Sequence, residues 1–181
     1  IEPLEEFKHD IDRILEKRSG SVVFAAAGAT SGSVSFNVHP HSLDGSSLLS
    51  ETSGPEADGF KRTVDMVRVD DVIKEKNLDG PYFLKLDVQG AELDALDGCS
   101  EILTKTDVVA MEVSLFQFMK TAPELFDVIA YMKKKGFVAF DIVLQWNRPL
   151  DNALGQIDII FVQEAGPFRT DHAFATLDQL K

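Results

Sequence analysis

Apolar segments typical of buried strands alternate with amphipathic segments typical of helices along most of the chain. The strand-like segments are residues 21–27, 34–38, 63–69, 82–88, 108–115, 137–143 and 157–162. The segments with a helical spacing of apolar residues are 3–18, 70–77, 91–103 and 123–135. This alternation predicts an α/β fold with a mostly parallel sheet. Because no helix separates the last two strands, we expect them to pair antiparallel.

Length and composition suit one globular domain. The chain has 181 residues, of which 44% are hydrophobic, and domains usually contain ~100–200 residues. Its 18 Lys and Arg against 30 Asp and Glu give a net charge of −12. We therefore expect no nucleic-acid partner, because phosphate backbones are bound by clustered cations. No apolar run approaches the ~20 residues that span a bilayer. The single cysteine, Cys99, excludes an internal disulfide and fits a reducing compartment, so we expect a cytoplasmic protein.

The segment Leu84–Glu92, with the sequence LKLDVQGAE, is the most informative candidate site. Ligands of open α/β sheets bind beyond the carboxyl ends of strands. Asp87 ends an apolar strand, Gly90 allows a sharp turn, and Glu92 opens the next helix. A carboxylate at Asp87 would point into the crevice at the sheet edge. The alternative is a cluster of acids that only complements the helix dipole.

Two further acids are candidates for a site. Glu2 follows Ile1, and an acid at a strand end binds the ribose diol in nucleotide-binding α/β folds. The alternative for Glu2 is a carboxylate that favours a helix start. Glu112 lies within an apolar strand, where a charged group needs a partner. Either a functional role or an ion pair with Lys85 explains it.

The polar segment 39–62 is too long for an ordinary connection, so it is functional or mobile. His39 and His41 flank Pro40, but two imidazoles are too few for a metal site, and we predict none. Ser46 and Ser47 either line a polar pocket or belong to a simple linker. Catalytic motifs with fixed spacing, such as the phosphate-binding loop, are absent.

Six segments, in chain order, carry a resemblance to a known family. They are Ile1–Pro3, Ala25–Gly28, Ser46–Leu48, Val69–Asp71, Leu84–Glu92 and Met111–Val113. Together they resemble the FkbM-type methyltransferases, and the string Lys-x-Asp-x-x-Gly-Ala-Glu is the most specific of them. The resemblance implies a Rossmann-like class I methyltransferase sheet, one methyltransferase domain over residues 1–181, and S-adenosylmethionine as the cofactor.

The resemblance also implies roles for single residues. Glu2 would bind the ribose, Ala26 and Ala27 would flank the adenine, and Asp87 would stand beside the methyl group and the acceptor. Glu112 would line the acceptor side. The family's first strand and glycine-rich loop should precede Ile1, so we expect the chain to lack the N-terminal part of the domain.

The expected reaction is O-methylation of a small-molecule or glycan acceptor, with a sugar hydroxyl as the best candidate. We expect Ser46, Ser47, Gln89 and Glu112 to bind this acceptor. The family usually has an acid where this chain has Gln89, and this change would alter the acceptor pocket. A hydroxyl needs a base that takes its proton. Asp87 is the first candidate base and His41 is the second.

Two other functions remain open at this point. A nicotinamide-dependent oxidoreductase would use a similar sheet, and Tyr131 with Lys135 has the Tyr/Lys spacing of such enzymes. A non-catalytic binding module would keep the fold without the reaction. Gln89 and the missing glycine-rich loop favour the module, whereas the acids Glu2, Asp87 and Glu112 argue against it.

Overall fold

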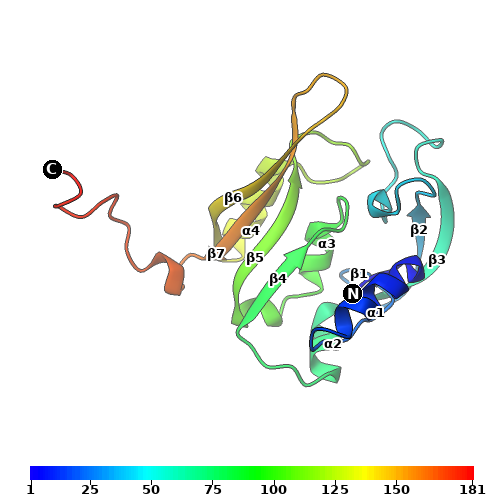
Figure 1. The fold of residues 1–181 in the computed structure, drawn as a ribbon, viewed down its shortest axis with the longest axis horizontal. Coiled ribbons are helices and arrows are strands. Elements are labelled where there is room, and N and C mark those ends of the chain that lie inside the picture. Colours follow the sequence, from blue (N-terminus) through cyan, green and yellow to red (C-terminus); the bar gives the residue numbers. More distant parts are fainter.

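The computed structural model describes residues 1–181 as two β-sheets with helices packed around them (Figure 1). The strands are β1 (Ala26–Ala27), β2 (Gly32–Val38), β3 (Phe60–Val67), β4 (Tyr82–Leu86), β5 (Thr106–Ser114), β6 (Phe137–Asn147) and β7 (Leu154–Gln163). The α-helices are α1 (Lys8–Leu15), α2 (Val69–Glu75), α3 (Glu92–Asp97) and α4 (Leu125–Lys134). Short 3-10 helices cover Glu5–Phe7, Leu43–Gly45, Ile102–Lys105 and Pro167–Arg169.

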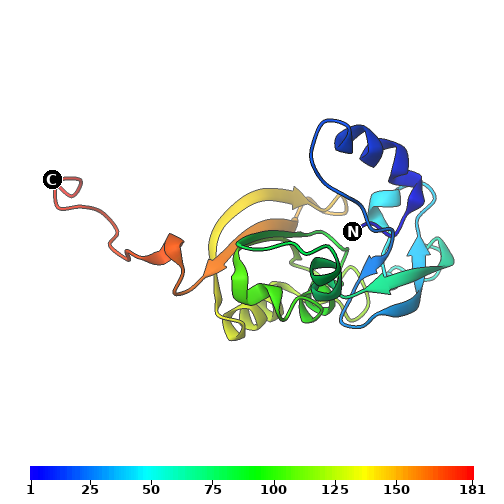
Figure 2. The ribbon, with the colours of Figure 1, turned by 90° about the horizontal axis from the view of Figure 1, so that it is seen from below.

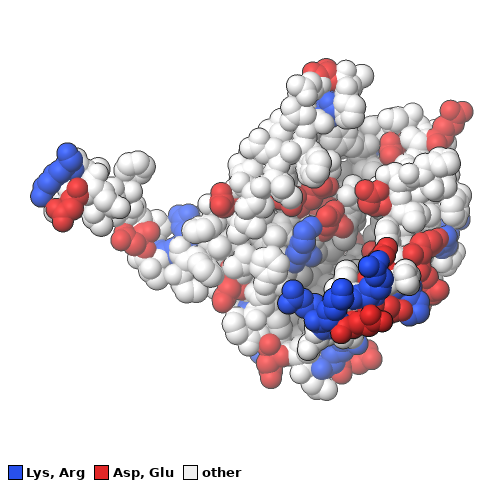
Figure 3. Space-filling model, in the orientation of Figure 1, with Lys and Arg blue, Asp and Glu red and all other residues white.

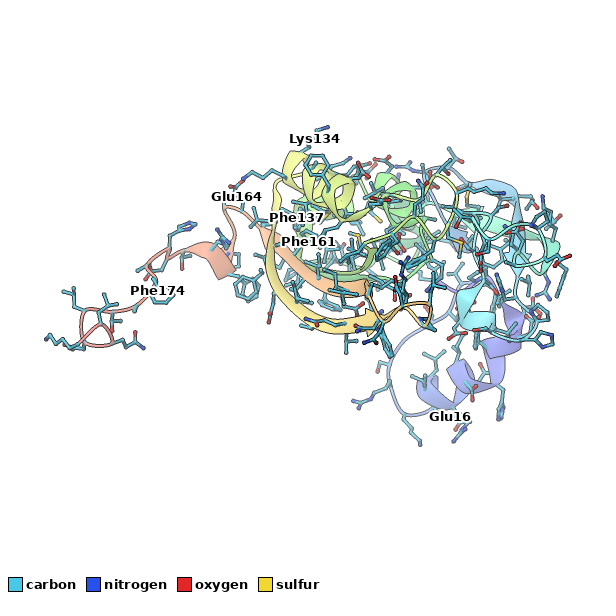
Figure 4. All side chains as sticks on the ribbon, turned by 90° about the horizontal axis from the view of Figure 1, so that it is seen from above. Glu16, Lys134, Phe137, Phe161, Glu164 and Phe174 are labelled. Atoms are coloured by element: carbon cyan, nitrogen blue, oxygen red, sulfur yellow. The ribbon has the colours of Figure 1, made fainter.

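The larger sheet has the strand order β4-β5-β7-β6 and holds the main core. Strand β7 pairs antiparallel with both β5 and β6, so the predicted antiparallel pair of last strands is confirmed. Helices α3 and α4 lie on the same face of this sheet (Figure 2). Phe137 and Phe161 fill the space between α4 and the sheet, each at most 2% exposed (Figure 4). Burial of one such side chain contributes roughly 1.5–3 kcal/mol.

The smaller sheet has the order β1-β3-β2, with β1 parallel and β2 antiparallel to β3. Its core is a separate apolar cluster that contains Leu4, Phe36, Val38 and Val64. Leu4 brings the first residues of the chain against this sheet, while α1 itself has no buried residue. The two sheets therefore have two cores rather than a common one.

The architecture is a mixed α/β fold that differs from the expected mostly parallel sheet. Only two strand pairs, β1 with β3 and β4 with β5, are parallel, and the other three are antiparallel. The predicted strand 21–27 is reduced to Ala26–Ala27. An apolar run indicates burial but not a hydrogen-bonding partner, and residues 21–25 are not part of a strand.

The predicted helix 91–103 is interrupted, and a glycine in close contact with another segment lies at the interruption. Helix α3 ends at Asp97, and a 3-10 helix follows from Ile102. Gly98 lies between them with its Cα against the backbone after β1, because a Cβ there would come within 2.2 Å of the Gly28 carbonyl oxygen. The close approach of these backbones requires a glycine at this position.

Asp70 is the first residue of the predicted helix 70–77, but it does not cap α2, whose N-cap is Arg68. It lies inside α2 and is 4% exposed. Its carboxylate accepts hydrogen bonds from the backbone amides of Glu101 and Ile102, both at 3.0 Å, and from the Ser100 hydroxyl at 3.2 Å. Arg68 donates to the same carboxylate at 3.1 Å. An acid that caps its own helix and an acid that caps a helix elsewhere in the chain cannot be distinguished in a sequence, because each is simply an acid near a helix start.

The last residues form an extended segment that leaves the body of the protein (Figures 1 and 2). Phe174 lies in this segment and is 99% exposed (Figure 4). No helix in the structure has the length and hydrophobicity that a bilayer crossing requires.

Candidate active site

The turn after β4 is the centre of the candidate site. Gln89 and Gly90 both have positive φ angles, of 50° and 95°, so the backbone reverses sharply there. Glu92, only 5% exposed, accepts hydrogen bonds from the amides of Val88 at 3.3 Å and Gly90 at 3.1 Å. Burial raises the pKa of the Glu92 carboxyl, and these backbone hydrogen bonds oppose the rise. Glu92 therefore stabilises the turn by accepting hydrogen bonds from two of its backbone amides.

A cavity lies between this turn, the first residues of the chain and β1. It contains about 580 Å³ of space between side chains, part of which is open to solvent. Six residues expected from the sequence line it, namely Glu2, Ala26, Ala27, Ser46, Asp87 and Gln89. The structure thus brings together side chains from four segments that are far apart in the sequence.

The lining of the cavity combines apolar side chains with carboxylates. Phe36, Leu43 and Leu48 are among the apolar residues, whereas Glu2, Asp44 and Asp87 supply the acids. An apolar wall with a few polar groups is typical of a small-molecule site. Such a lining can hold a ligand that has both a flat apolar ring and hydroxyl or amino groups.

One of the two carboxylate oxygens of Glu2 already has a hydrogen-bond donor within the chain. Its Oε1 atom accepts a hydrogen bond from the Leu4 amide at 2.8 Å. Burial raises the pKa of its carboxyl, and the Leu4 hydrogen bond opposes that rise. Its backbone amide donates to the Val23 carbonyl oxygen at 3.0 Å, which fixes the first residues beside β1. The second carboxylate oxygen accepts no hydrogen bond from the chain.

The two serines of the long loop hold its shape. The Ser46 hydroxyl accepts a hydrogen bond from the His39 amide at 3.0 Å. The Ser47 hydroxyl donates to the Gln89 carbonyl at 2.7 Å and accepts from the Leu49 amide at 2.9 Å. Ser47 is 1% exposed. It therefore links the loop to the turn after β4, and both of its hydrogen-bonding directions are used within the chain.

Glu112 lies on the strand next to β4, half-buried, among other acids. Its Oε1 accepts hydrogen bonds from the side-chain amides of Gln156 at 2.6 Å and Gln89 at 3.4 Å. Burial and, to a smaller extent, the neighbouring carboxylates of Asp87, Glu92 and Asp158 raise the pKa of Glu112 to about 7, although Lys85 opposes the rise. Figure 3 shows acidic side chains over this end of β4 and β5, beside a hollow in the surface.

Lys85 does not form the ion pair with Glu112 that the sequence left open. Its Nζ atom lies 2.9 Å from Asp87 Oδ2, and about half of its side chain is exposed. The positive charge of Lys85 therefore compensates the negative charge of the Asp87 carboxylate, and Glu112 has no cation bonded to it.

The two histidines lie apart from this arrangement. The Nε2 atom of His39 lies 3.3 Å from Glu51 Oε1. His41 is exposed and does not line the cavity. The described geometry thus offers no support for His41 as a base.

Gln156 and Asp158 were missed by reasoning from the sequence. Both lie on β7, and Asp158 pairs directly with Glu112 across the sheet. They alternate with the buried Ile157 and Ile159, so they lie on the face opposite the main core. This alternation was visible in the sequence and is the signal that could have identified them.

Comparison with known families agrees with this geometry. The family model for the methyltransferase FkbM domain matches residues 1–139. The chain belongs to the FkbM methyltransferase family. No curated protein and no solved structure matches it. The FkbM match includes every residue of the cavity, Glu112 and both parallel strand pairs, and family membership supports a methyltransferase activity.

Proposed function

We propose that this FkbM-family protein uses S-adenosylmethionine to methylate a hydroxyl group of a small-molecule or glycan acceptor, with a sugar as the preferred acceptor class. The observation that carries the proposal is the cavity at the carboxyl end of β4, lined by Glu2, Ala26, Ala27 and Asp87. Open α/β sheets bind nucleotide-like ligands at this end of their strands.

The residues of the cavity fit the cofactor. The free oxygen of Glu2 can accept hydrogen bonds from a ribose diol. Ala26 and Ala27 leave room for a flat ring, and Phe36 offers an apolar surface to it. Asp87 can accept a hydrogen bond from an ammonium or hydroxyl group. When bound, S-adenosylmethionine would supply an electrophilic sulfonium methyl group.

The chain's own contribution is to position the acceptor and to remove its proton. The reacting oxygen must lie roughly 3–3.5 Å from the methyl carbon, and such positioning supplies much of the rate. Gln89, which contacts both Asp87 and Glu112, would bind the acceptor together with Glu112 on the side of β5. An uncharged hydroxyl becomes a better nucleophile as a neighbouring carboxylate takes its proton.

The tyrosines give no support to the oxidoreductase alternative. The Tyr131 hydroxyl donates to Asp97 at 2.6 Å, and the Tyr82 hydroxyl donates to the Leu78 carbonyl at 2.7 Å. Neither residue lines the cavity. In an oxidoreductase, the proton donor that accompanies hydride transfer would have to reach the cavity.

Calorimetric titration of S-adenosylhomocysteine into the protein tests the cofactor site. We expect binding that Glu2→Gln weakens at least about tenfold, because a ribose hydrogen bond to a charged group contributes roughly 1.5–3 kcal/mol. Glu5→Gln is the matched control, since Glu5 is exposed in the same segment. Equal affinity of the Glu2 variant and the wild type would contradict the assigned ribose site. Binding without any methyl transfer would favour the non-catalytic module.

A further inference from the structure

The side-chain amide of Gln89 lies between two carboxylates of the proposed site. Its Nε2 atom is 3.2 Å from Asp87 Oδ1 and 3.4 Å from Glu112 Oε1. An amide nitrogen carries two hydrogens, so it can donate to both acids at once. Gln89 also lines the cavity, whereas Glu112 lies one strand further along the sheet. The amide therefore connects the cavity with Glu112.

The two acids differ in their partners. Asp87 forms an ion pair with the Lys85 ammonium at 2.9 Å. Glu112 is held by two neutral amides, Gln89 and Gln156, and has no cation within bonding distance. Of the two, Glu112 is therefore the one whose environment favours binding a proton.

The charges that face Glu112 come from every element around it. Asp87 and Lys85 belong to β4 and the turn after it, Glu92 to α3, and Asp158 to β7. Asp158 is the direct cross-strand partner of Glu112, and like charges in such a pair repel each other. Three acids and a single cation leave an excess of negative charge, which uptake of a proton by Glu112 reduces.

We propose that Glu112 is the catalytic base, and that Gln89 and Gln156 are positioning residues that hold its carboxylate toward the acceptor. This inference rests on the proposed function and replaces Asp87 and His41 as candidate bases. As the acceptor oxygen forms its bond to the methyl carbon, its proton moves to Glu112. The sulfur atom keeps the electron pair of the broken carbon–sulfur bond, which neutralises its positive charge.

The acid–base properties of Glu112 agree with this role. Burial and the neighbouring acids raise its pKa to about 7, and a base is most effective when its pKa is near the working pH. Only the ionised form can take a proton. The rate of methyl transfer should therefore fall as the pH falls through about 7.

The first measurement is a carboxyl-carbon NMR titration of the unliganded protein, which is independent of activity. We expect Glu112 to titrate well above the ordinary range of a glutamate. In Gln89→Glu, the additional carboxylate should raise this midpoint further. A Glu112 midpoint in the ordinary range, or one that Gln89→Glu leaves in place, would overturn the proposal.

The second measurement is the transfer of labelled methyl groups from S-adenosylmethionine to methyl hexosides as acceptor probes. Glu112→Gln should lower the rate at least about 100-fold while binding of S-adenosylhomocysteine stays unchanged, which shows that the variant is folded. Asp107→Asn is the matched control, because it removes a carboxylate from the opposite end of β5. Gln89→Glu should move the acid limb of the pH profile in the same direction as the NMR midpoint.

The outcomes separate this inference from the proposed function. In one result, the wild type fails to bind S-adenosylhomocysteine; in another, it binds this compound and methylates no hexoside. Either result would contradict the proposed function, and the role of Glu112 with it. Methylation by the wild type with an undiminished rate in Glu112→Gln would overturn the role of Glu112 alone.

Discussion

Gly90 shows how a single residue can shape the site. Its φ angle of 95° lies in the left-handed region that favours glycine. A Cβ at this position would come within 3.1 Å of Ala122 Cβ and 3.2 Å of Leu49 Cδ1. The turn after β4 therefore needs a glycine both for its backbone conformation and for the close contact with two loops.

Replacement of Gly90 by Ala should destabilise the protein by about 2–3 kcal/mol, because backbone strain and crowding add. Gly136→Ala is the matched control. Gly136 has a φ angle of 84°, but nothing lies within 4 Å of its would-be Cβ. We expect the control to cost only about 1 kcal/mol. Urea unfolding of both variants measures the difference, and equal losses would show that the contacts with Ala122 and Leu49 are unimportant.

At the scale of elements, the Asp70 carboxylate joins helix α2 to the 3-10 helix before β5. It satisfies two backbone amides, a hydroxyl and an arginine from within a buried position. Amides at a helix start have no partner within the helix, so this acid supplies the missing acceptors. The contact fixes α2, which follows β3, against the segment that leads into β5.

Asp70→Ala should reduce the free energy of unfolding by about 2–4 kcal/mol, since it leaves buried amides without acceptors. Asp71→Ala serves as the control, because Asp71 is the next residue in the chain and its side chain is 58% exposed. A surface change of this kind should cost less than about 0.5 kcal/mol. The measurement is chemical denaturation of both variants under the same conditions. Similar stabilities would indicate that Asp70 is not the connection between these elements.

At the scale of the whole molecule, contacts between loops hold the two sheets together. Glu51 and Met119 form an isolated β-bridge, and the Ser47 hydroxyl reaches the Gln89 carbonyl. The cavity is lined both by Ala26, Ala27 and Phe36 of the smaller sheet and by the turn after β4, so its shape depends on both sheets. By contrast, the final residues contribute little, as Phe174, Leu177 and Leu180 are all mostly exposed.

Removal of residues 171–181 should therefore change the free energy of unfolding by less than about 0.5 kcal/mol. Their amides should also exchange with deuterium within seconds in the intact protein, because the segment has few internal contacts. A loss of more than about 1 kcal/mol on truncation would show that the segment packs against the body in solution.

Local patterns in the sequence were sufficient for part of this description. The apolar runs identified most strands, and the missing helix between β6 and β7 predicted their antiparallel pairing, because chain connectivity limits direction. Likewise, the strand–turn–helix pattern around Asp87 and Gly90 placed the candidate site at a strand end. Such features depend on residues that are close in sequence, so the positions of glycines and acids are enough to predict them.

Only the tertiary structure decided which distant residues meet. The division into two sheets and the cap that Asp70 gives to Ile102 depend on contacts between segments that are distant in the sequence. The hydrogen bond from Gln156 to Glu112 joins residues 44 positions apart. A sequence records the chemistry of each side chain, but packing determines its partners, and the partners set the charge and pKa of a group such as Glu112.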